Sequence, residues 1–214
     1  MAWAGCRFSL SVSFVILLIA FLYFSTVFVF LSQWFGVWSS YGMLNAFAFT
    51  TILVFCIFNY ILAMFTNPGR VPTNTDEDDN IIVQEIMPKD GDLRYCQRCS
   101  FYRPPRAHHC IKCDTCVLRM DHHCIWINNC VGHGNYKFFF ISLVYAVTAC
   151  LYSLVLFVGS LSMGSVGDHR IRSSHKTLYI ISGLVLVPLS IVLASLLAWH
   201  IYLIYQNKTT IEVQ

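Results

Sequence analysis

Charged side chains are scarce in this chain. Asp, Glu, Lys and Arg together make up 12% of its 214 residues, whereas hydrophobic residues make up 57%. Soluble domains carry about 25% charged residues, and the mean hydropathy of +0.60 is far above what such domains show. The composition therefore excludes an ordinary soluble protein and indicates a membrane protein.

Charge is absent from four apolar stretches, each longer than the roughly 20 helical residues that cross a hydrocarbon core of about 30 Å. We predict an all-α membrane protein with four transmembrane helices at residues 9–31, 43–65, 138–160 and 178–205. The first stretch is also longer than the apolar core of a secretory signal, which is about 7–15 residues. We therefore interpret it as a retained anchor.

Lysine and arginine are absent from residues 32–42, whereas nine of them lie between the second and third spans. The positive-inside rule places the segment with the cations in the cytosol. Both termini, 1–8 and 206–214, are then cytosolic, and the loops 32–42 and 161–177 are lumenal. Three cations in the 161–177 loop give a weaker opposing signal.

The compartment is predicted only broadly, as the Golgi or endoplasmic reticulum membrane, with the plasma membrane as an alternative. One glycosylation sequon, Asn207-Lys208-Thr209, tests the orientation, because only a lumenal C-terminus exposes it to glycosylation. We predict that it stays unmodified.

Cysteine is concentrated between the second and third spans, where seven of the ten cysteines lie within Cys96–Cys130. In a reducing cytosol such a segment is metal-binding or catalytic rather than disulfide-linked. We interpret residues 66–94 as a cytosolic linker. Residues 95–137 form a domain too small for its own apolar core, which favours organisation by bound metal.

Paired Cys-x2-Cys spacings at Cys96/Cys99 and Cys110/Cys113, with nearby histidines, suit structural zinc. A RING ubiquitin ligase would end in another such pair, which the spacing of Cys124 and Cys130 does not provide. Two four-ligand sites built from seven thiols and histidines can leave one cysteine free for chemistry.

Several motifs of this segment match a known family. They are Cys96-x2-Cys99, Arg103-Pro104-Pro105-Arg106, His109-Cys110-x2-Cys113-x2-Cys116, Asp121-His122-His123-Cys124, Cys130 and Asn135-Tyr136-Lys137-Phe138-Phe139. Together with the four spans, they resemble the DHHC-type protein S-acyltransferases, or palmitoyltransferases, in a plant-like form with a short C-terminus. The resemblance covers nearly the whole chain.

This resemblance implies two structural zinc ions with interleaved ligands, held in a cytosolic zinc-binding catalytic domain at 95–137. The implied ligands are Cys96, Cys99, His109 and Cys116 for one zinc, and Cys110, Cys113, His123 and Cys130 for the other. Cys124 is then the cysteine left over.

The implied activity is the transfer of a long-chain acyl group from acyl-coenzyme A to cysteine thiols of membrane-associated proteins. We assign Cys124 as the nucleophile that carries the acyl thioester, His122 as its base and Asp121 as the group that orients His122. In an extended segment His122 and Cys124 share a face while His123 points away. Asp121 then needs a bend in the chain to reach His122.

Candidate residues for binding acyl-coenzyme A come from two regions. Trp126, Tyr145 and Ala149 are candidates for lining an acyl cavity among the spans, with helix packing or interfacial anchoring as the alternative. Arg103 and Arg106 are candidates for the coenzyme phosphates, with positive-inside charge or anionic headgroups as the alternative. The expected partners are substrate proteins and the bilayer, without nucleic acid.

Three features depart from the family pattern. Asn67-Pro68-Gly69 stands where Asp-Pro-Gly is usual, and Ile125 stands where proline is frequent after the nucleophile. The motif Thr209-Thr210-x-Glu212 is followed closely by Gln214, whereas similar proteins continue into a longer tail. The alternative function is therefore a catalytically silent, zinc-bearing membrane scaffold. A metal transporter is disfavoured because its ligands would lie within the spans.

Overall fold

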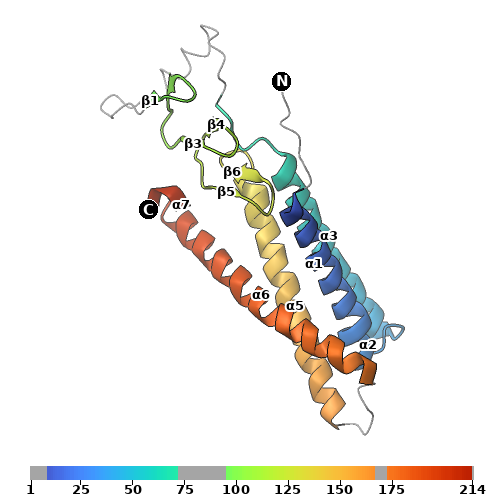
Figure 1. Ribbon diagram of the computed structural model, residues 1–214. Helices are drawn as coiled ribbons and strands as arrows, with labels where there is room; N and C mark the ends of the chain where they lie inside the picture. The colour runs from blue at the N-terminus through green and yellow to red at the C-terminus, as the bar shows by residue number, and fades with distance from the viewer. Residues whose placement is uncertain (1–8, 72–94, 167–172, 214) are drawn as a thin grey trace. The chain divides into compact units, whose positions relative to one another are not determined.

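A computed structural model describes residues 9–71, 95–166 and 173–213, and these fall into two compact units. The helical unit consists of Val12–Asn59 and Phe140–Ile201. We call the other unit the hairpin unit. It contains the described residues of 9–11, 60–139 and 202–213 (Figure 1). Cations that contributed to the predicted orientation but lie outside the described residues are Lys89, Arg94, Arg170 and Arg172.

Long helices make up most of the chain. They are α1 (Leu10–Phe24), continued by the π-helix η1 (Ser25–Leu31) and the short α2 (Ser32–Trp34), then α3 (Ser40–Phe65), α5 (Tyr136–Val166) and α6 (Ser173–Tyr205). Within the described residues, four segments are long and apolar enough to cross a membrane, namely Leu10–Trp34, Ser40–Phe65, Tyr136–Ser162 and Thr177–Tyr205. The predicted four-span helical fold is confirmed.

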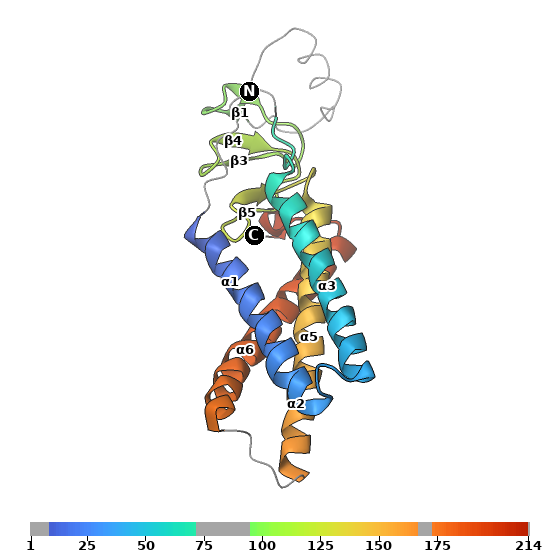
Figure 2. The ribbon, with the colours of Figure 1, turned by 90° about the vertical axis from the view of Figure 1, so that its right-hand side faces the viewer.

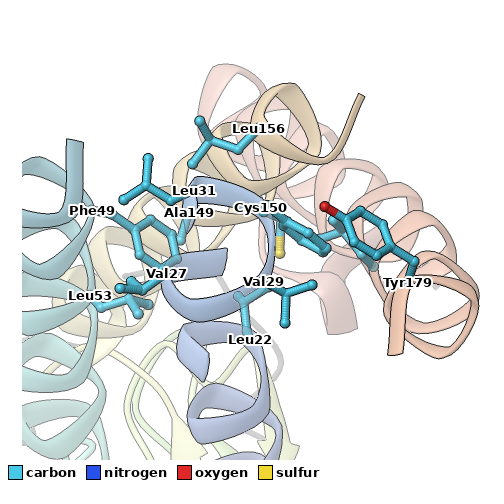
Figure 3. Packing of buried hydrophobic residues seen from close by; sticks show 12 residues of the cluster. Leu22, Val27, Val29, Leu31, Phe49, Leu53, Ala149, Cys150, Leu156 and Tyr179 are labelled. Carbon is cyan, nitrogen blue, oxygen red and sulfur yellow. The ribbon is translucent and has the colours of Figure 1, made fainter. Parts of the chain in front are cut away.

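The helical unit is organised around one apolar cluster. In both ribbon views α1, α3 and α5 run side by side (Figures 1 and 2). Figure 3 shows Val27, Phe49, Ala149 and Tyr179 of the cluster, drawn from the first three spans and α6. Such packing, rather than burial away from water, is what holds helices together inside a bilayer.

The π-helical segment η1 disturbs the regular hydrogen-bond pattern of the first span. The hydroxyl of Thr26 donates to the carbonyl of Leu22 at 2.6 Å and also pairs with the Ser153 hydroxyl of α5 at 2.7 Å. Side-chain hydroxyls of this kind satisfy carbonyls that an altered helix leaves without a partner.

Among the described residues between the second and third spans there are three antiparallel hairpins. They pair β1 (Tyr95–Cys96) with β2 (Phe101–Tyr102), β3 (His108–Cys110) with β4 (Thr115–Val117), and β5 (His122–Cys124) with β6 (Asn129–Val131). Each turn ends in a residue with positive φ, namely Ser100, Asp114 and Asn128. Equivalent positions lie 14 residues apart, as for Cys96, Cys110 and Cys124. The hairpins are therefore structural repeats.

The chain leaving α3 is bound to these hairpins through the Asn67-Pro68-Gly69 turn. The Asn67 side-chain oxygen accepts the N–H groups of Gly69 at 3.0 Å and Arg70 at 2.9 Å, so asparagine keeps the turn without the charge of aspartate. A Cβ at Gly134 would lie 2.2 Å from the Asn67 carbonyl, so only glycine fits there. The backbone of Val71 then donates to the Cys116 carbonyl at 2.9 Å.

Two buried asparagines tie the end of α3 to β6. Asn129 donates its side-chain amide to the carbonyls of Met64 at 3.0 Å and Thr66 at 3.1 Å, with a longer contact of 3.4 Å to Ala63. Asn135 donates to the Ala63 carbonyl at 3.0 Å. The last carbonyls of a helix have no partner within it, so these amides satisfy them and attach the end of α3 to β6.

Candidate functional site

The first two hairpins bring together one set of predicted zinc ligands. The donor atoms of Cys96, Cys99, His109 and Cys116 all lie within 4.8 Å of one another. The Nδ1 atom of His109 is 3.2 Å from the Cys99 sulfur and 3.6 Å from the Cys96 sulfur, and the sulfurs of Cys99 and Cys116 are 3.8 Å apart. A tetrahedral zinc with Zn–S bonds of about 2.3 Å and Zn–N bonds of about 2.0–2.1 Å separates its ligand atoms by about 3.6–3.8 Å. The cluster fits such an ion.

The second and third hairpins repeat the arrangement with Cys110, Cys113, His123 and Cys130, whose donor atoms also lie within 4.8 Å of one another. Here Nδ1 of His123 is 3.5, 3.4 and 3.6 Å from the sulfurs of Cys110, Cys113 and Cys130. Each cluster takes its histidine and last cysteine from a cross-strand pair, His109–Cys116 or His123–Cys130. Either cluster could hold a metal ion, and the two together would link three hairpins into one unit.

Four of the six thiols in these clusters are buried, and those of Cys99 and Cys113 are partly exposed. Burial raises the pKa of Cys116, and the neighbouring Cys113 raises the pKa of Cys130 through a hydrogen bond. A hydrogen bond to Cys130 in turn lowers the pKa of Cys113 to about 5. Because a thiol binds a metal as the thiolate, metal binding must displace the protons of the thiols with raised pKa values. The chemistry of the donor set therefore agrees with its geometry in favouring a thiophilic cation such as zinc.

Cys124 belongs to neither cluster and lies at the end of β5, hydrogen-bonded to His122. The Nδ1 atom of His122 is 2.7 Å from Oδ2 of Asp121, which leaves Nε2 for the thiol. Asp121 is 1% exposed and Cys124 is 6% exposed, whereas the His122 side chain is 31% exposed. The three side chains thus form a continuous acid–base–thiol chain with one partly open member.

Electrostatic interactions among Asp121, His122 and Cys124 favour the charged form of each of these three side chains. Burial lowers the pKa of His122, but hydrogen bonds to Asp121 and Cys124 raise it by more, to about 9. Burial raises the pKa of Cys124, but its hydrogen bond to His122 outweighs this and lowers it below the usual value. The pKa of Asp121 is likewise lowered, because hydrogen bonds from His122 and Thr210 outweigh its burial.

The backbone supplies the bend that this arrangement requires. Arg119 has a φ of +45°, in the left-handed region, and Asp121 then donates its N–H to the Val131 carbonyl at 2.8 Å. From there β5 is extended, so His122 and Cys124 contact each other while His123 reaches the second metal cluster.

Residues after the fourth span complete the surroundings of Asp121. Helix α7 (Thr210–Val213) begins with Thr210, whose N–H donates to Oδ1 of Asp121 at 3.0 Å and whose hydroxyl donates to Oδ2 at 2.9 Å. Glu212 accepts the N–H of Thr209 at 2.8 Å and binds Arg106 through both carboxylate oxygens, at 2.5 and 2.6 Å. The Thr209-Thr210-x-Glu212 motif therefore holds the carboxylate that orients His122.

The residues predicted to bind acyl-coenzyme A are not gathered into one place by the described contacts. Arg106 is paired with Glu212, a use that sequence reasoning did not foresee. Trp126 is 49% exposed, and its carbonyl accepts the Tyr60 hydroxyl at 2.7 Å. In the helical unit Tyr145 stacks on Phe55, and Ala149 is fully buried in the apolar cluster. Arg103 is half-buried.

The sequence analysis did not predict the contacts of Tyr60 and Asn129, nor that Thr210 donates hydrogen bonds to the Asp121 carboxylate. No signal in the sequence marked the first two residues, since Tyr60 is one of several aromatic residues within the second span and Asn129 is a polar residue beside a predicted metal ligand. Thr210 did give one, since its motif was recognised but its partner, 89 residues away, was not.

The fold and site define a class, that of multi-pass membrane proteins with a metal-binding triple hairpin that carries a Cys–His–Asp chain. A family model described as DHHC palmitoyltransferase matches residues 89–214. The chain is 58% identical to probable protein S-acyltransferase 16 of Arabidopsis thaliana over 212 residues, 97% of this chain and 74% of that protein.

Two further relatives extend the comparison. Probable protein S-acyltransferase 15 of Arabidopsis thaliana is 43% identical over 90% of this chain and 75% of its own length. Human palmitoyltransferase ZDHHC20 is 38% identical over 56% of this chain and 33% of its own length. This chain belongs to the DHHC palmitoyltransferase family.

Proposed function

We propose that this protein is a protein-cysteine S-palmitoyltransferase, which moves a long-chain acyl group from acyl-coenzyme A to cysteine thiols of membrane-associated proteins. The observation that carries the proposal is the hydrogen-bonded chain of Asp121, His122 and Cys124 beside two metal clusters that leave this thiol free. No described contact favours a catalytically silent scaffold, since the acid–base–thiol chain is complete.

The first half-reaction begins from the charged form of the pair. The raised pKa of His122, about 9, and the lowered pKa of Cys124 both favour transfer of the thiol proton to His122. The Cys124 thiolate attacks the thioester carbonyl of acyl-coenzyme A. As the bond to the coenzyme sulfur breaks, His122 gives its proton to the departing thiolate.

The second half-reaction reverses these roles. A substrate cysteine gives its proton to His122 and attacks the acyl thioester on Cys124, which leaves as the thiolate. One thioester replaces another, so the exchange needs positioning more than an energy source. Asp121 holds His122 in one orientation throughout, and Thr210 in turn holds Asp121.

Zinc is the ion we assign to the two clusters. Held by Cys96, Cys99, His109 and Cys116 in one, and by Cys110, Cys113, His123 and Cys130 in the other, it would supply structural cross-links between the hairpins. Because Cys124 and Cys130 lie on paired strands, a firmly held second cluster also fixes the position of the nucleophile.

We place the hairpin domain, residues 95–137, and both termini in the cytosol, where acyl-coenzyme A and reduced substrate thiols occur. Our expectation that no glycan is attached to the Asn207 sequon rests on this cytosolic placement of the C-terminus. A Golgi or endoplasmic reticulum membrane remains the proposed compartment. Trp126, Tyr145 and Ala149 remain our proposed candidates for contact with the acyl chain.

Acylation of the purified, detergent-solubilised protein with a clickable palmitoyl-coenzyme A tests the proposal. We expect hydroxylamine-sensitive label on the wild type and on Cys56→Ser, a control at a buried cysteine of the helical unit. Cys124→Ser should carry no label while retaining the zinc content of the wild type. A zinc-loaded, folded wild type that takes no label would contradict the proposed activity.

A further inference from the structure

The turn that follows the nucleophile directs backbone groups at its sulfur. Strand β5 ends at Cys124 and β6 begins at Asn129, so residues 125–128 form the turn between them. Within it, the N–H groups of Trp126 and Ile127 both donate hydrogen bonds to the Cys124 sulfur. Two peptide dipoles therefore converge on the reacting atom, an arrangement that binds negative charge.

The same turn occurs in the first and second hairpins. The Cys96 sulfur accepts the N–H groups two and three positions later, and the Cys110 sulfur accepts the N–H of Cys113 at 3.4 Å. In those hairpins the residue three positions after the first cysteine is a second thiol, and both thiols belong to one metal cluster. In the third hairpin that residue is Ile127, so the turn keeps its converging N–H groups but lacks the second thiol.

The donors of this turn are held firmly. Ile127 is 3% exposed and packs with Ala63, Val131 and Phe139. The Tyr60 hydroxyl donates to the carbonyl of Trp126 at 2.7 Å, and that carbonyl shares a peptide group with the N–H of Ile127. In a planar trans peptide the C=O and N–H point in opposite directions. By binding the carbonyl, Tyr60 therefore aims the N–H at Cys124.

We propose that this turn is the oxyanion site of the acyl transfer, with the backbone N–H groups of Trp126 and Ile127 as its donors and Tyr60 as the residue that positions them. The inference rests on the proposed function. When the Cys124 thiolate bonds to the thioester carbon, the carbonyl π electrons move to oxygen, which is two bonds from the sulfur on which the donors converge.

The reaction remains balanced through this intermediate. Its collapse restores the carbonyl and breaks the bond to the coenzyme sulfur, which takes the proton from His122. Because the substrate thiol attacks the same carbonyl in the second half-reaction, the same two donors would serve both steps. Preformed donors of this kind cost no reorganisation when charge develops, and loss of one typically slows an enzyme about 10²–10³-fold.

Isotope-edited infrared spectroscopy of the acyl-enzyme tests the proposal. The probe is palmitoyl-coenzyme A labelled with ¹³C at the thioester carbonyl. We expect the carbonyl stretch of the wild-type acyl-enzyme to lie at a lower frequency than in the same acyl-enzyme after denaturation, because hydrogen bonds weaken the C=O bond. Tyr60→Phe should move the band back towards the denatured value and lower kcat for acylation about 10-fold with KM unchanged.

Tyr41→Phe is the matched control, since it removes the same hydroxyl from an exposed residue of the same helix. A wild-type band equal to that of denatured acyl-enzyme overturns the oxyanion site. A slow Tyr60→Phe with an unshifted band overturns the positioning role of Tyr60. Failure of the proposed function is distinct from both, since the wild type would then take no label, or Cys124→Ser would still take it.

Discussion

The second and third hairpins share a backbone design but put it to different uses. Both carry His-His-Cys on their first strand, at 108–110 and 122–124, with equivalent cross-strand pairs and a positive φ at the end of the turn. Cys110 lies in a metal cluster, whereas the equivalent Cys124 does not. A repeated fold thus supplies one thiol within a metal-ligand cluster and one thiol outside both clusters.

Three substitutions between the repeats account for the difference. Asp121 stands where the second hairpin has Ala107, Ile127 replaces Cys113, and Asn129 replaces Thr115. The aspartate orients His122, the isoleucine removes a metal ligand next to the nucleophile, and the asparagine binds the end of α3. On the proposed function, the reactivity of Cys124 comes from a missing metal ligand and an added orienting acid within the same hairpin fold.

The largest contrast should come from changing the two equivalent cysteines. Cys110→Ser should lose the second metal and unfold the hairpin unit, because structural zinc in small domains contributes about 10–16 kcal/mol of apparent folding free energy. Cys124→Ser should keep both metals and the wild-type melting temperature while losing all acylation. Zinc content by mass spectrometry and thermal unfolding check this. A metal-free but stable Cys110→Ser would contradict the structural role of the cluster.

Asp121→Asn should lower acylation by on the order of 10²–10⁴-fold, by comparison with loss of the orienting acid in a serine-protease triad. It should also change the pH profile. His122 must carry a proton for the departing coenzyme, and its pKa of about 9 keeps it protonated through neutral pH. Wild-type activity should therefore fall only above about pH 9.

Without the carboxylate the pKa of His122 falls. The loss of activity at alkaline pH should therefore begin at a lower pH in Asp121→Asn than in the wild type. Initial rates measured across the neutral and alkaline range check the direction, with zinc content as the control for folding. An alkaline limb at the same pH in both proteins would show that His122 does not set it.

Asn129→Thr replaces Asn129 of the third hairpin by the residue at the equivalent position of the second hairpin, Thr115. Threonine has no amide to donate to the carbonyls at the end of α3, and each buried acceptor left without a partner costs about 1–3 kcal/mol. We expect a loss of about 2 kcal/mol in the free energy of unfolding, measured by denaturant titration in detergent. The reciprocal Thr115→Asn, at a half-buried position, should change stability by less than about 0.5 kcal/mol. Equal effects of the two substitutions would remove the special role of Asn129.

Ile127→Cys restores the missing thiol of the third turn and should make the nucleophile a metal ligand. We expect micromolar cadmium to lower acylation of this variant at least about 10-fold and to produce a thiolate–cadmium absorption band, because paired thiols bind soft cations. Ile127→Ser is the matched control without a thiol. The same cadmium inhibition in both variants would show that the metal acts elsewhere.

Arg106→Ala should have the smallest effect. Its bidentate pair with Glu212 is partly exposed, at 32% and 23% for the two side chains, and such pairs are worth up to about 1 kcal/mol. We expect about a five-fold loss of activity as Thr210 loosens from Asp121. Glu212→Gln should have a similar effect and should add nothing to Arg106→Ala. Arg98→Ala, at an exposed position, serves as the control.

Much of the fold could be read from the sequence because the relevant signals are local. A span needs only a sufficiently long apolar run, and Cys-x2-Cys is the spacing of one tight turn. The 14-residue repeat was also present in the spacing of Cys96, Cys110 and Cys124, but its meaning depends on turn geometry that the spacing alone does not reveal.

The parts of the site that sequence reasoning missed are contacts between distant residues. Thr210 reaches Asp121 across 89 positions, Tyr60 reaches Trp126 across 66, and Asn129 reaches Met64 across 65. Each is one polar residue whose partner is chosen by how helices and hairpins pack, so no periodicity marks it.

The sequence by itself determined that this chain is a four-span membrane protein of the DHHC palmitoyltransferase family, because hydrophobic length and motif spacing are properties of the chain as written. Only the tertiary structure decided what holds the Asp121 carboxylate and which backbone groups meet the Cys124 sulfur. Hydrogen bonds act over about 3 Å, so their partners are fixed only when folding brings distant segments together.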